Sequence, residues 1–140
     1  MTKQLTLEII TPEKQVFQDQ VDFVVLPAEK GECGILPGHA HLLTQLAHGE
    51  LRIKKAESIE HFAVCGGFAE VRNNKISVFA ETAEMAKEID IERARLASEK
   101  AKAALSQTVD PEHLASAQAS LRRALLRLHI SERIGKRRAH

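Results

Sequence analysis

The sequence is poor in aromatic residues and in cysteine, and both shortages narrow what the protein can be. Aromatic residues make up 4% of the chain, all of them are Phe, and Trp and Tyr are absent. Such a chain has little with which to stack nucleic-acid bases or to line a flat aromatic ligand site. Two cysteines, Cys33 and Cys65, are too few for a disulfide framework, so we expect reduced thiols in a cytoplasmic setting.

Long apolar runs are also missing. No stretch approaches the roughly 18 apolar residues of a membrane span, and residues 1–7 lack the basic start and apolar block of a signal peptide. We therefore expect the chain to meet a membrane only through a partner. The sequence contains no Ser/His/Asp or Cys/His order that suggests a nucleophile, and no glycine-rich phosphate loop after a strand, so we do not expect an enzyme in its own right.

The net charge of +1 conceals two parts of opposite charge. Residues 1–84 contain 8 Lys and Arg against 12 Asp and Glu, whereas residues 85–140 contain 12 against 7. A change of this kind is typical of two modules. We place the domain boundary between residues 84 and 85.

The first module has the alternating pattern of short β-strands. Turn-forming pairs, including Pro37-Gly38 and Asn73-Asn74, separate its apolar segments, and Asn-Asn suits a tight hairpin because Asn tolerates positive φ. The pattern predicts an all-β sandwich or flattened barrel that ends near Glu81. The alternating segments are residues 5–9, 21–25, 51–53, 62–64 and 76–80.

The second module has a helical period. Residues 90–105 are rich in Ala, Glu, Lys and Arg without Gly or Pro, which favours a helix with Asp90 at its start. Residues 106–109 break the pattern, and Asp110-Pro111 is typical of a second helix start. Two helices joined by a short turn predict an antiparallel hairpin, and the fold class is then α+β. The expected apolar stripe of the second helix is Leu114, Ala117, Leu121, Leu125 and Leu128.

Several motifs in order resemble the ε subunit of bacterial F-type ATP synthase over almost the whole chain. They are "LEIITPEKQVF" near the start, "GECGILPGHAHLLTQL" in the middle, "GGFAEV" before a strand and "IDIERARLA" at the first helix. The resemblance implies a non-catalytic rotor subunit in the central stalk of a proton- or sodium-driven ATP synthase, at the cytoplasmic face of the bacterial inner membrane.

The same resemblance assigns a role to each module. Residues 1–84 would dock on the γ subunit and the ring of c subunits. Residues 85–140 would form a mobile regulatory hairpin that swings toward the catalytic α and β subunits and inhibits ATP hydrolysis.

The resemblance also implies a nucleotide site in the hairpin. Some bacterial ε subunits bind ATP through an Ile/Leu-Asp-x-x-Arg-Ala motif and two arginines one turn apart on the second helix. ATP would be a regulatory ligand, and no cofactor would be required. Lys100 departs from relatives that offer an arginine there. From composition alone, the expected interpretation of these residues is solvated charges, with an i,i+3 ion pair between Asp90 and Arg93. The matching residues are Glu84, Ile89, Asp90, Arg93, Ala94, Arg123 and Arg127.

The segment "CGILPGHAHLL" admits two interpretations. His39 and His41 have the i,i+2 spacing of metal ligands on one side of a strand, but no acidic or thiol partner with metal-site spacing accompanies them. The other interpretation is a docking turn, with Pro37-Gly38 at the centre of a type II turn. The resemblance favours docking, and it assigns Glu32 and His39 to the contact with γ and the c ring.

The basic second helix admits two partners. Beyond Pro111, seven Lys or Arg residues oppose only two Glu. The resemblance implies that Arg122 and Arg133, with their basic neighbours, meet an acidic segment of the catalytic β subunit. Nucleic acid is the alternative partner for the same charge, but the acidic first module and the lack of aromatics in the basic stretch argue against it.

Overall fold

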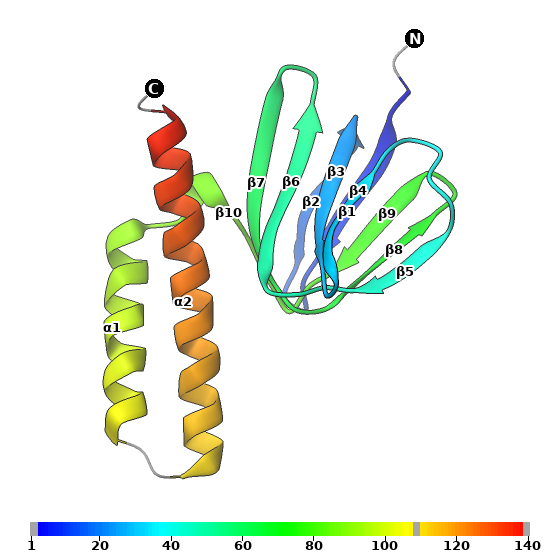
Figure 1. The fold of residues 1–140 in the computed structure, drawn as a ribbon. Coiled ribbons are helices and arrows are strands. Elements are labelled where there is room, and N and C mark those ends of the chain that lie inside the picture. The colour runs from blue at the N-terminus through cyan, green and yellow to red at the C-terminus, as the bar shows by residue number, and fades with distance from the viewer. Residues whose placement is uncertain (1–2, 108–109, 139–140) are drawn as a thin grey trace. The chain divides into compact units, whose positions relative to one another are not determined.

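The computed structural model describes residues 3–107 and 110–138, with side chains as far as residue 133. The chain divides into two compact units, residues 1–85 and residues 86–140. The first unit contains the strands and the second contains the helices (Figure 1). The predicted α+β fold, an N-terminal sandwich followed by a two-helix hairpin, is therefore confirmed.

In the first unit the described residues form two five-stranded sheets. All neighbouring strands are antiparallel except β1 and β9, which are parallel. Sheet A has the order β2 (Gln15–Val21), β1 (Leu5–Ile10), β9 (Lys75–Phe79), β8 (Phe68–Arg72) and β5 (Leu42–Gln45). Sheet B has the order β10 (Thr82–Met85), β7 (Ser58–Cys65), β6 (Gly49–Lys55), β3 (Phe23–Ala28) and β4 (Gly31–Ile35).

The core of this unit is made by the inward-facing residues that the alternating pattern identified. Leu7, Ile53 and Ile76 have no exposed surface, and Phe62 is equally buried with its ring in edge-to-face contact with Phe17 at 5.6 Å between centroids. Burying a side chain of this size stabilises the fold by about 1.5–3 kcal/mol. The sheets are therefore held together by a single apolar layer.

Two turns have the predicted geometry. Asn73 and Asn74 both have positive φ, 50° and 60°, which is the requirement of a two-residue type I′ hairpin. Gly38 has φ of 81°, and the His39 N–H donates to the Leu36 carbonyl at 3.2 Å, as in a type II turn centred on Pro37-Gly38. The Asn74 side chain joins the two turns, because the Gly38 N–H donates to its Oδ1 at 2.9 Å.

The predicted end of the β-module near Glu81 is wrong. One more strand, β10, follows it and pairs with β7, with Glu84 opposite Ala63. The segment Thr82–Met85 is short, and only tertiary pairing with β7 gives it a partner. The predicted domain boundary, after residue 84, lies beside the junction between Met85 and Ala86.

The edge strand β2 carries a charge on its inward-facing side. Asp19 alternates with Phe17 and Val21, and its carboxylate pairs with Lys55 at the end of β6 in the other sheet. The hydrogen bond from Lys55 and a second one from the Gln20 N–H, at 2.8 Å, lower the pKa of the Asp19 carboxyl below its ordinary value. A charge that faces inward on an edge strand opposes pairing with a second chain.

The lowered pKa of Asp19 predicts a pH-dependent contribution to stability. The contribution is present above the pKa that Asp19 has in the unfolded chain, and it is lost as pH falls through the lower folded pKa. Asp19→Asn is therefore expected to destabilise the protein at neutral pH and to lose that effect as pH falls from about 4, the ordinary value for Asp, through the lower folded pKa. Urea unfolding of both proteins at several pH values measures the difference, and a constant difference would contradict the pairing.

The second unit contains a 3₁₀ turn and two helices. The turn η1 (Ala86–Glu88) precedes α1 (Ile91–Gln107), and α2 (Pro111–Arg138) runs back antiparallel to α1 (Figure 1). The helix α1 includes Ser106 and Gln107, where we expected a break, and the remaining two residues of that break lie outside the described residues. Most of the buried side chains of the two helices are small, namely Ala94, Ser98, Ala101, Ala117, Ala124 and Ser131, and Ile130 of α2, at 1% exposed, is the large exception.

The predicted apolar stripe of α2 is partly wrong. Ala117 is buried, but Leu125 is 44% exposed, and the buried position in its place is Ala124. One residue is a rotation of about 100° on a helix, so Leu125 points away from α1. Small residues at the contact bring the helix axes close together, which turns the larger leucines toward the rim.

Candidate functional site

The start of α1 is fixed by Asp90. Its Oδ1 accepts a hydrogen bond from the Arg93 N–H at 3.1 Å, and its carbonyl accepts one from the Ala94 N–H at 3.0 Å. Asp90 is thus the N-cap of α1, where a carboxylate also interacts favourably with the helix dipole. Within the described part of the chain, the expected ion pair between the Asp90 and Arg93 side chains is absent, because Asp90 bonds to backbone instead.

Removal of the Asp90 cap is expected to destabilise α1. Asp90→Ala should cost about 1 kcal/mol, whereas Asp90→Asn, which keeps the capping oxygen, should cost only a few tenths. Amide hydrogen exchange in residues 91–95 measures the effect. Equal protection in the two variants would mean that the cap contributes nothing to the helix start.

The residues of the predicted nucleotide motif differ in exposure. Ile89 and Ala94 are buried, at 8% and 0% exposed, so they support the helix start, whereas the Arg93 side chain is exposed. Glu84 is half-buried and belongs to β10 in the first unit. The motif thus offers one exposed cation, Arg93, one capping carboxylate and two apolar supports.

The two arginines of α2 are one turn apart. Arg123 is exposed and donates to the Ser120 hydroxyl at 3.3 Å, and Arg127 is half-buried. Residues four apart project from the same face of a helix, so the two guanidinium groups can act on one ligand. Two guanidinium groups side by side suit a polyphosphate, because each can donate paired hydrogen bonds.

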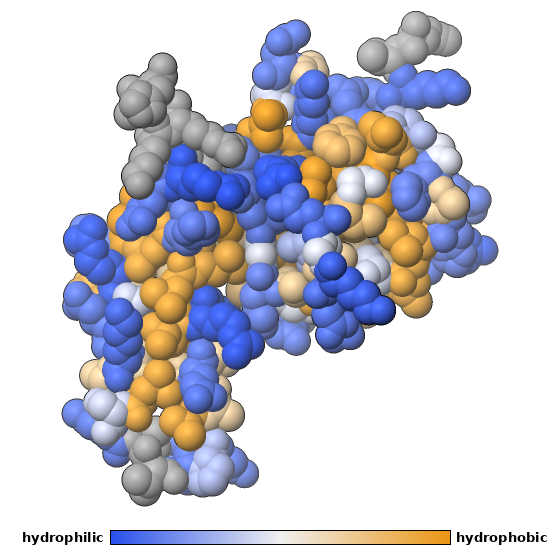
Figure 2. Space-filling view, in the orientation of Figure 1, coloured by the Kyte–Doolittle hydropathy of each residue, from blue (hydrophilic) through white to orange (hydrophobic). Residues whose placement is uncertain are grey.

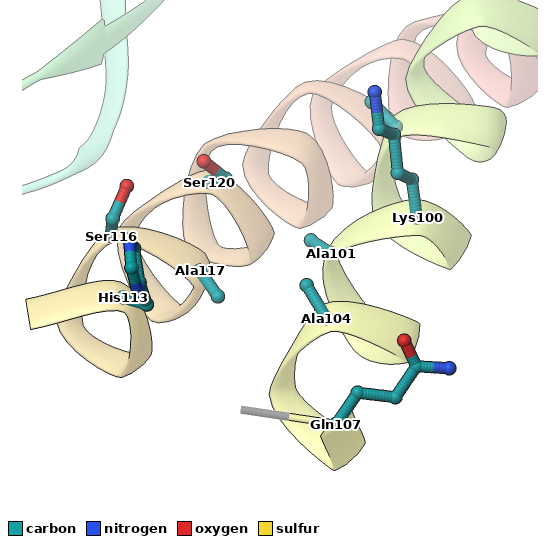
Figure 3. A pocket seen from close by; sticks show the side chains of 9 residues that line it. Lys100, Ala101, Ala104, Gln107, His113, Ser116, Ala117 and Ser120 are labelled. Atoms are coloured by element: carbon teal, nitrogen blue, oxygen red, sulfur yellow. The ribbon is translucent and has the colours of Figure 1, made fainter. Parts of the chain in front are cut away.

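A groove lies between the two helices, and sequence reasoning did not find it. Ala101 and Ala104 of α1 face Ala117 of α2 across it, with polar side chains from both helices at its rim (Figure 3). Lys100, which departs from the ATP-binding pattern, lines the groove, whereas the seven residues of the predicted nucleotide motif are not among the lining residues. Its lining residues are Ala97, Lys100, Ala101, Ala104, Gln107, His113, Ser116, Ala117 and Ser120.

Apolar side chains run along the hairpin on one side, with hydrophilic side chains on both flanks (Figure 2). Three large apolar residues of the two helices are exposed, namely Ile91 at 39%, Leu96 at 64% and Leu125 at 44%. Mutual packing of α1 and α2 therefore leaves apolar surface uncovered.

The two histidines of the predicted docking turn do not lie on a strand. His39 and His41 follow the turn at Gly38, and β5 begins only at Leu42. The His39 Nδ1 is 2.7 Å from the Ala40 carbonyl, and the His41 Nε2 is 3.7 Å from the Glu70 carboxylate. The described residues contain no group of three or more side chains suited to hold a metal ion.

The predicted partner contacts are on the surface or half-buried. Glu32 on β4 is exposed and accepts a hydrogen bond at 2.7 Å from Arg52 on β6. Arg122 on α2 is exposed, and Arg133 near the end of α2 is half-buried. A charged pair such as Glu32–Arg52 at the surface contributes little to stability.

Sheet A carries an apolar patch on its outer face, which sequence reasoning did not identify. Leu43, Phe68 and Phe79 are 64%, 48% and 38% exposed. Phe68 and Phe79 are paired across β8 and β9, and their rings stack with centroids 5.0 Å apart. Leu43 is on the neighbouring strand β5. Clustered apolar groups on one sheet face indicate an interaction surface.

Family models match both units. The model of the β-sandwich domain of the ATP synthase delta/epsilon chain matches residues 4–86, and that of its long α-helix domain matches residues 87–132. Curated relatives named ATP synthase epsilon chain include one from Nitratidesulfovibrio vulgaris strain DP4, 48% identical over 93% of this chain and 97% of the relative. Another, from Syntrophobacter fumaroxidans, is 42% identical over 95% and 99%.

Solved structures agree with this assignment. A chain in the Euglena gracilis mitochondrial ATP synthase (OSCP/F1/c-ring) is 27% identical, with a TM-score of 0.72 over 85% of this chain and 76% of that chain. A chain in the Tetrahymena thermophila central stalk/c-ring structure is 16% identical, with a TM-score of 0.63 over 94% and 99%, and shows the shared fold.

The two matched models describe a β-sandwich domain and a long α-helix domain of delta/epsilon chains, in the same order as the sandwich and the helices of this chain. This chain belongs to the epsilon-subunit family of F-type ATP synthases. Among its described residues, no helix is both long enough and apolar enough to cross a membrane.

Proposed function

We propose that the protein is a rotor subunit of the ATP synthase central stalk that couples the c ring to the catalytic head without catalytic residues of its own. Its first unit docks on the γ subunit and the c ring. The observation that carries this proposal is the exposed apolar patch of Leu43, Phe68 and Phe79. Apolar groups clustered on the surface of a monomer mark a site of interaction with another protein. The complex holds the subunit at the cytoplasmic face of the inner membrane.

Two polar residues of the first unit, Glu32 and His39, supply further contacts to these partners. Glu32 lies on the edge strand β4, and His39 lies in the turn that Asn74 anchors to the β8–β9 hairpin. Polar groups around an apolar centre are the usual arrangement of a protein interface. We assign Glu32 and His39 to the polar contacts that the first unit makes with its partners.

The second unit is the regulatory element of the proposed rotor subunit. Apart from Ile130, the buried side chains of its helices are small, so each buries little apolar area. Burial stabilises by about 0.8 kcal/mol per CH₂ group, and an alanine contributes little of this. A hairpin with weak internal contacts and exposed leucines can give up its contacts in the compact state for contacts with another subunit. In the extended state, Arg122 and Arg133 engage an acidic segment of the catalytic subunits and stop ATP hydrolysis.

ATP is the regulatory ligand that stabilises the compact hairpin in this proposal. Arg123 and Arg127 bind the phosphates, and Arg93 near the Asp90 cap orients the rest of the nucleotide, on Ile89 and Ala94 as apolar supports. Glu84 is the remaining residue that we assign to ATP binding. ATP at a hundredfold excess over its dissociation constant stabilises the compact state by about 2.7 kcal/mol, which releases inhibition when ATP is abundant.

Calorimetric titration of ATP into the full chain tests this assignment. Wild-type protein should bind ATP, and the Arg123→Ala/Arg127→Ala variant should lose binding by about tenfold or more. Lys102→Ala removes an exposed charge elsewhere on α1 and is the control. If all three proteins bind equally, or none binds, the hairpin is not an ATP sensor through these arginines, and the rotor proposal is unaffected.

A further inference from the structure

The outer face of sheet A changes from apolar to charged along β8 and β9. Phe68 and Phe79 form the apolar end, and Glu70 is opposite Ser77 in the middle. At the other end, next to the Asn73-Asn74 turn, Arg72 is directly opposite Lys75. Like charges directly opposite each other on neighbouring strands destabilise a sheet. The stability of the fold therefore does not account for the pairing of Arg72 with Lys75.

One of the two cations is neutralised and the other is not. The Lys75 Nζ pairs with the Glu8 carboxylate at 2.8 Å on the neighbouring strand β1. Arg72 is exposed and has no ion-pair partner among the described residues. Arg72 and Lys75 also border a shallow concavity of about 320 Å³, together with Glu70, Asn73 and Ser77.

The Arg72 end of the face is held on a rigid part of the fold. The Asn74 side chain donates to the Gln4 carbonyl at 2.8 Å and accepts from the Gly38 N–H at 2.9 Å, which ties three segments together beside Arg72. A preorganised cation loses less entropy on binding than one on a mobile loop. Arg72 also lies on the same face, and on the same strand, as Phe68 of the apolar patch.

We propose that a carboxylate of the subunit docked on the apolar patch pairs with Arg72. This inference rests on the proposed docking of the first unit on the γ subunit, and it adds that the docked surface presents an acidic side chain beside an apolar centre. The planar guanidinium can bind such a carboxylate with two parallel hydrogen bonds. A protein is favoured over a phosphate or lipid headgroup because Arg72 shares its strand and its sheet face with the exposed Phe68 of the apolar patch, which only a protein surface would cover at the same time.

The affinity of the full chain for immobilised γ subunit tests the inference. Arg72→Gln is expected to weaken binding by about tenfold or more at low salt, and to reduce the salt dependence of the affinity. Arg72→Lys keeps the charge but lacks the planar guanidinium that donates two parallel hydrogen bonds, so it should recover only part of the loss. Lys54→Gln removes an exposed charge from the other sheet and is the matched control. Arg72 is exposed, so the thermal midpoint should not change.

Phe68→Ser separates this inference from the docking proposal. If Phe68→Ser abolishes binding and Arg72→Gln behaves like Lys54→Gln, the docking stands and the acidic contact is wrong. If neither Phe68→Ser nor Arg72→Gln weakens binding, the docking face itself is wrong. If Arg72→Gln leaves γ binding unchanged but abolishes binding to phosphatidylglycerol vesicles, the face contacts lipid headgroups, which overturns the proposed protein carboxylate.

Discussion

Gly67→Ala is expected to lose about 3 kcal/mol or more of unfolding free energy in the first unit. Gly67 joins β7 to β8 with φ of 98°, where side chains are strained. A Cβ there would be 1.9 Å from the Phe79 carbonyl oxygen and 2.9 Å from the Ala80 Cα. Both are backbone atoms, so a rotamer change cannot relieve the overlap, and the β8–β9 pair must separate.

Gly38→Ala is the matched control for this prediction. Gly38 also has positive φ, 81°, but a Cβ there would meet no atom within 4 Å. Its expected cost is only the strain of the left-handed conformation, about 1–2 kcal/mol. Since 1 kcal/mol shifts the midpoint of a domain of this size by about 4–8 °C, thermal unfolding by circular dichroism separates the two variants. Equal midpoints would show that the backbone approach at Gly67 is unimportant.

Ala101→Leu is expected to destabilise the compact hairpin by about 1–3 kcal/mol. Ala101 is 6% exposed and faces Ala117 of α2 (Figure 3), so the larger side chain must push the helices apart. A loss of 1.4 kcal/mol is a tenfold change in population, so the variant should favour the extended state and inhibit ATP hydrolysis more strongly.

Hydrogen exchange in α1 and α2 measures this change directly. Ala103→Leu introduces the same side chain at an exposed position of the same helix, and its effect should stay within about 0.5 kcal/mol. If Ala101→Leu exchanges no faster than Ala103→Leu, the small-residue contact does not control the hairpin.

Local sequence signals predicted the features that depend on local chemistry. The Asn73-Asn74 hairpin, the Pro37-Gly38 turn and the Asp110-Pro111 helix start follow from the φ angles and hydrogen bonds that these residues favour. Asp110 caps α2 through the Glu112 N–H at 3.0 Å, as expected from its sequence position.

Features that depend on tertiary packing could not be predicted in the same way. Leu125 fits an apolar period as well as Ala124 does, and only the close approach of the two helices buries the smaller residue. The exposure of Phe68 and Phe79 was also hidden, because aromatic residues in strands are usually inward-facing and the cross-strand register decides which face they occupy.

In the candidate nucleotide site, too, the sequence predicted the features set by helical spacing and missed those set by tertiary structure. The sequence placed Asp90 at the helix start and Arg123 one turn before Arg127, since both follow from helical spacing. It could not show that the Asp90 side chain is engaged in capping, nor that a groove opens farther along the hairpin around Lys100.

The most direct test of a docking unit joined to a regulatory hairpin is ATP hydrolysis by a γ-containing catalytic complex that lacks its ε subunit. The full chain and a chain ending at Met85, which retains the sandwich core, are added separately, and binding and hydrolysis are both measured. The account predicts that both chains bind and that only the full chain inhibits, with added ATP relieving the inhibition. Failure of either chain to bind, or equal inhibition by both, would contradict it.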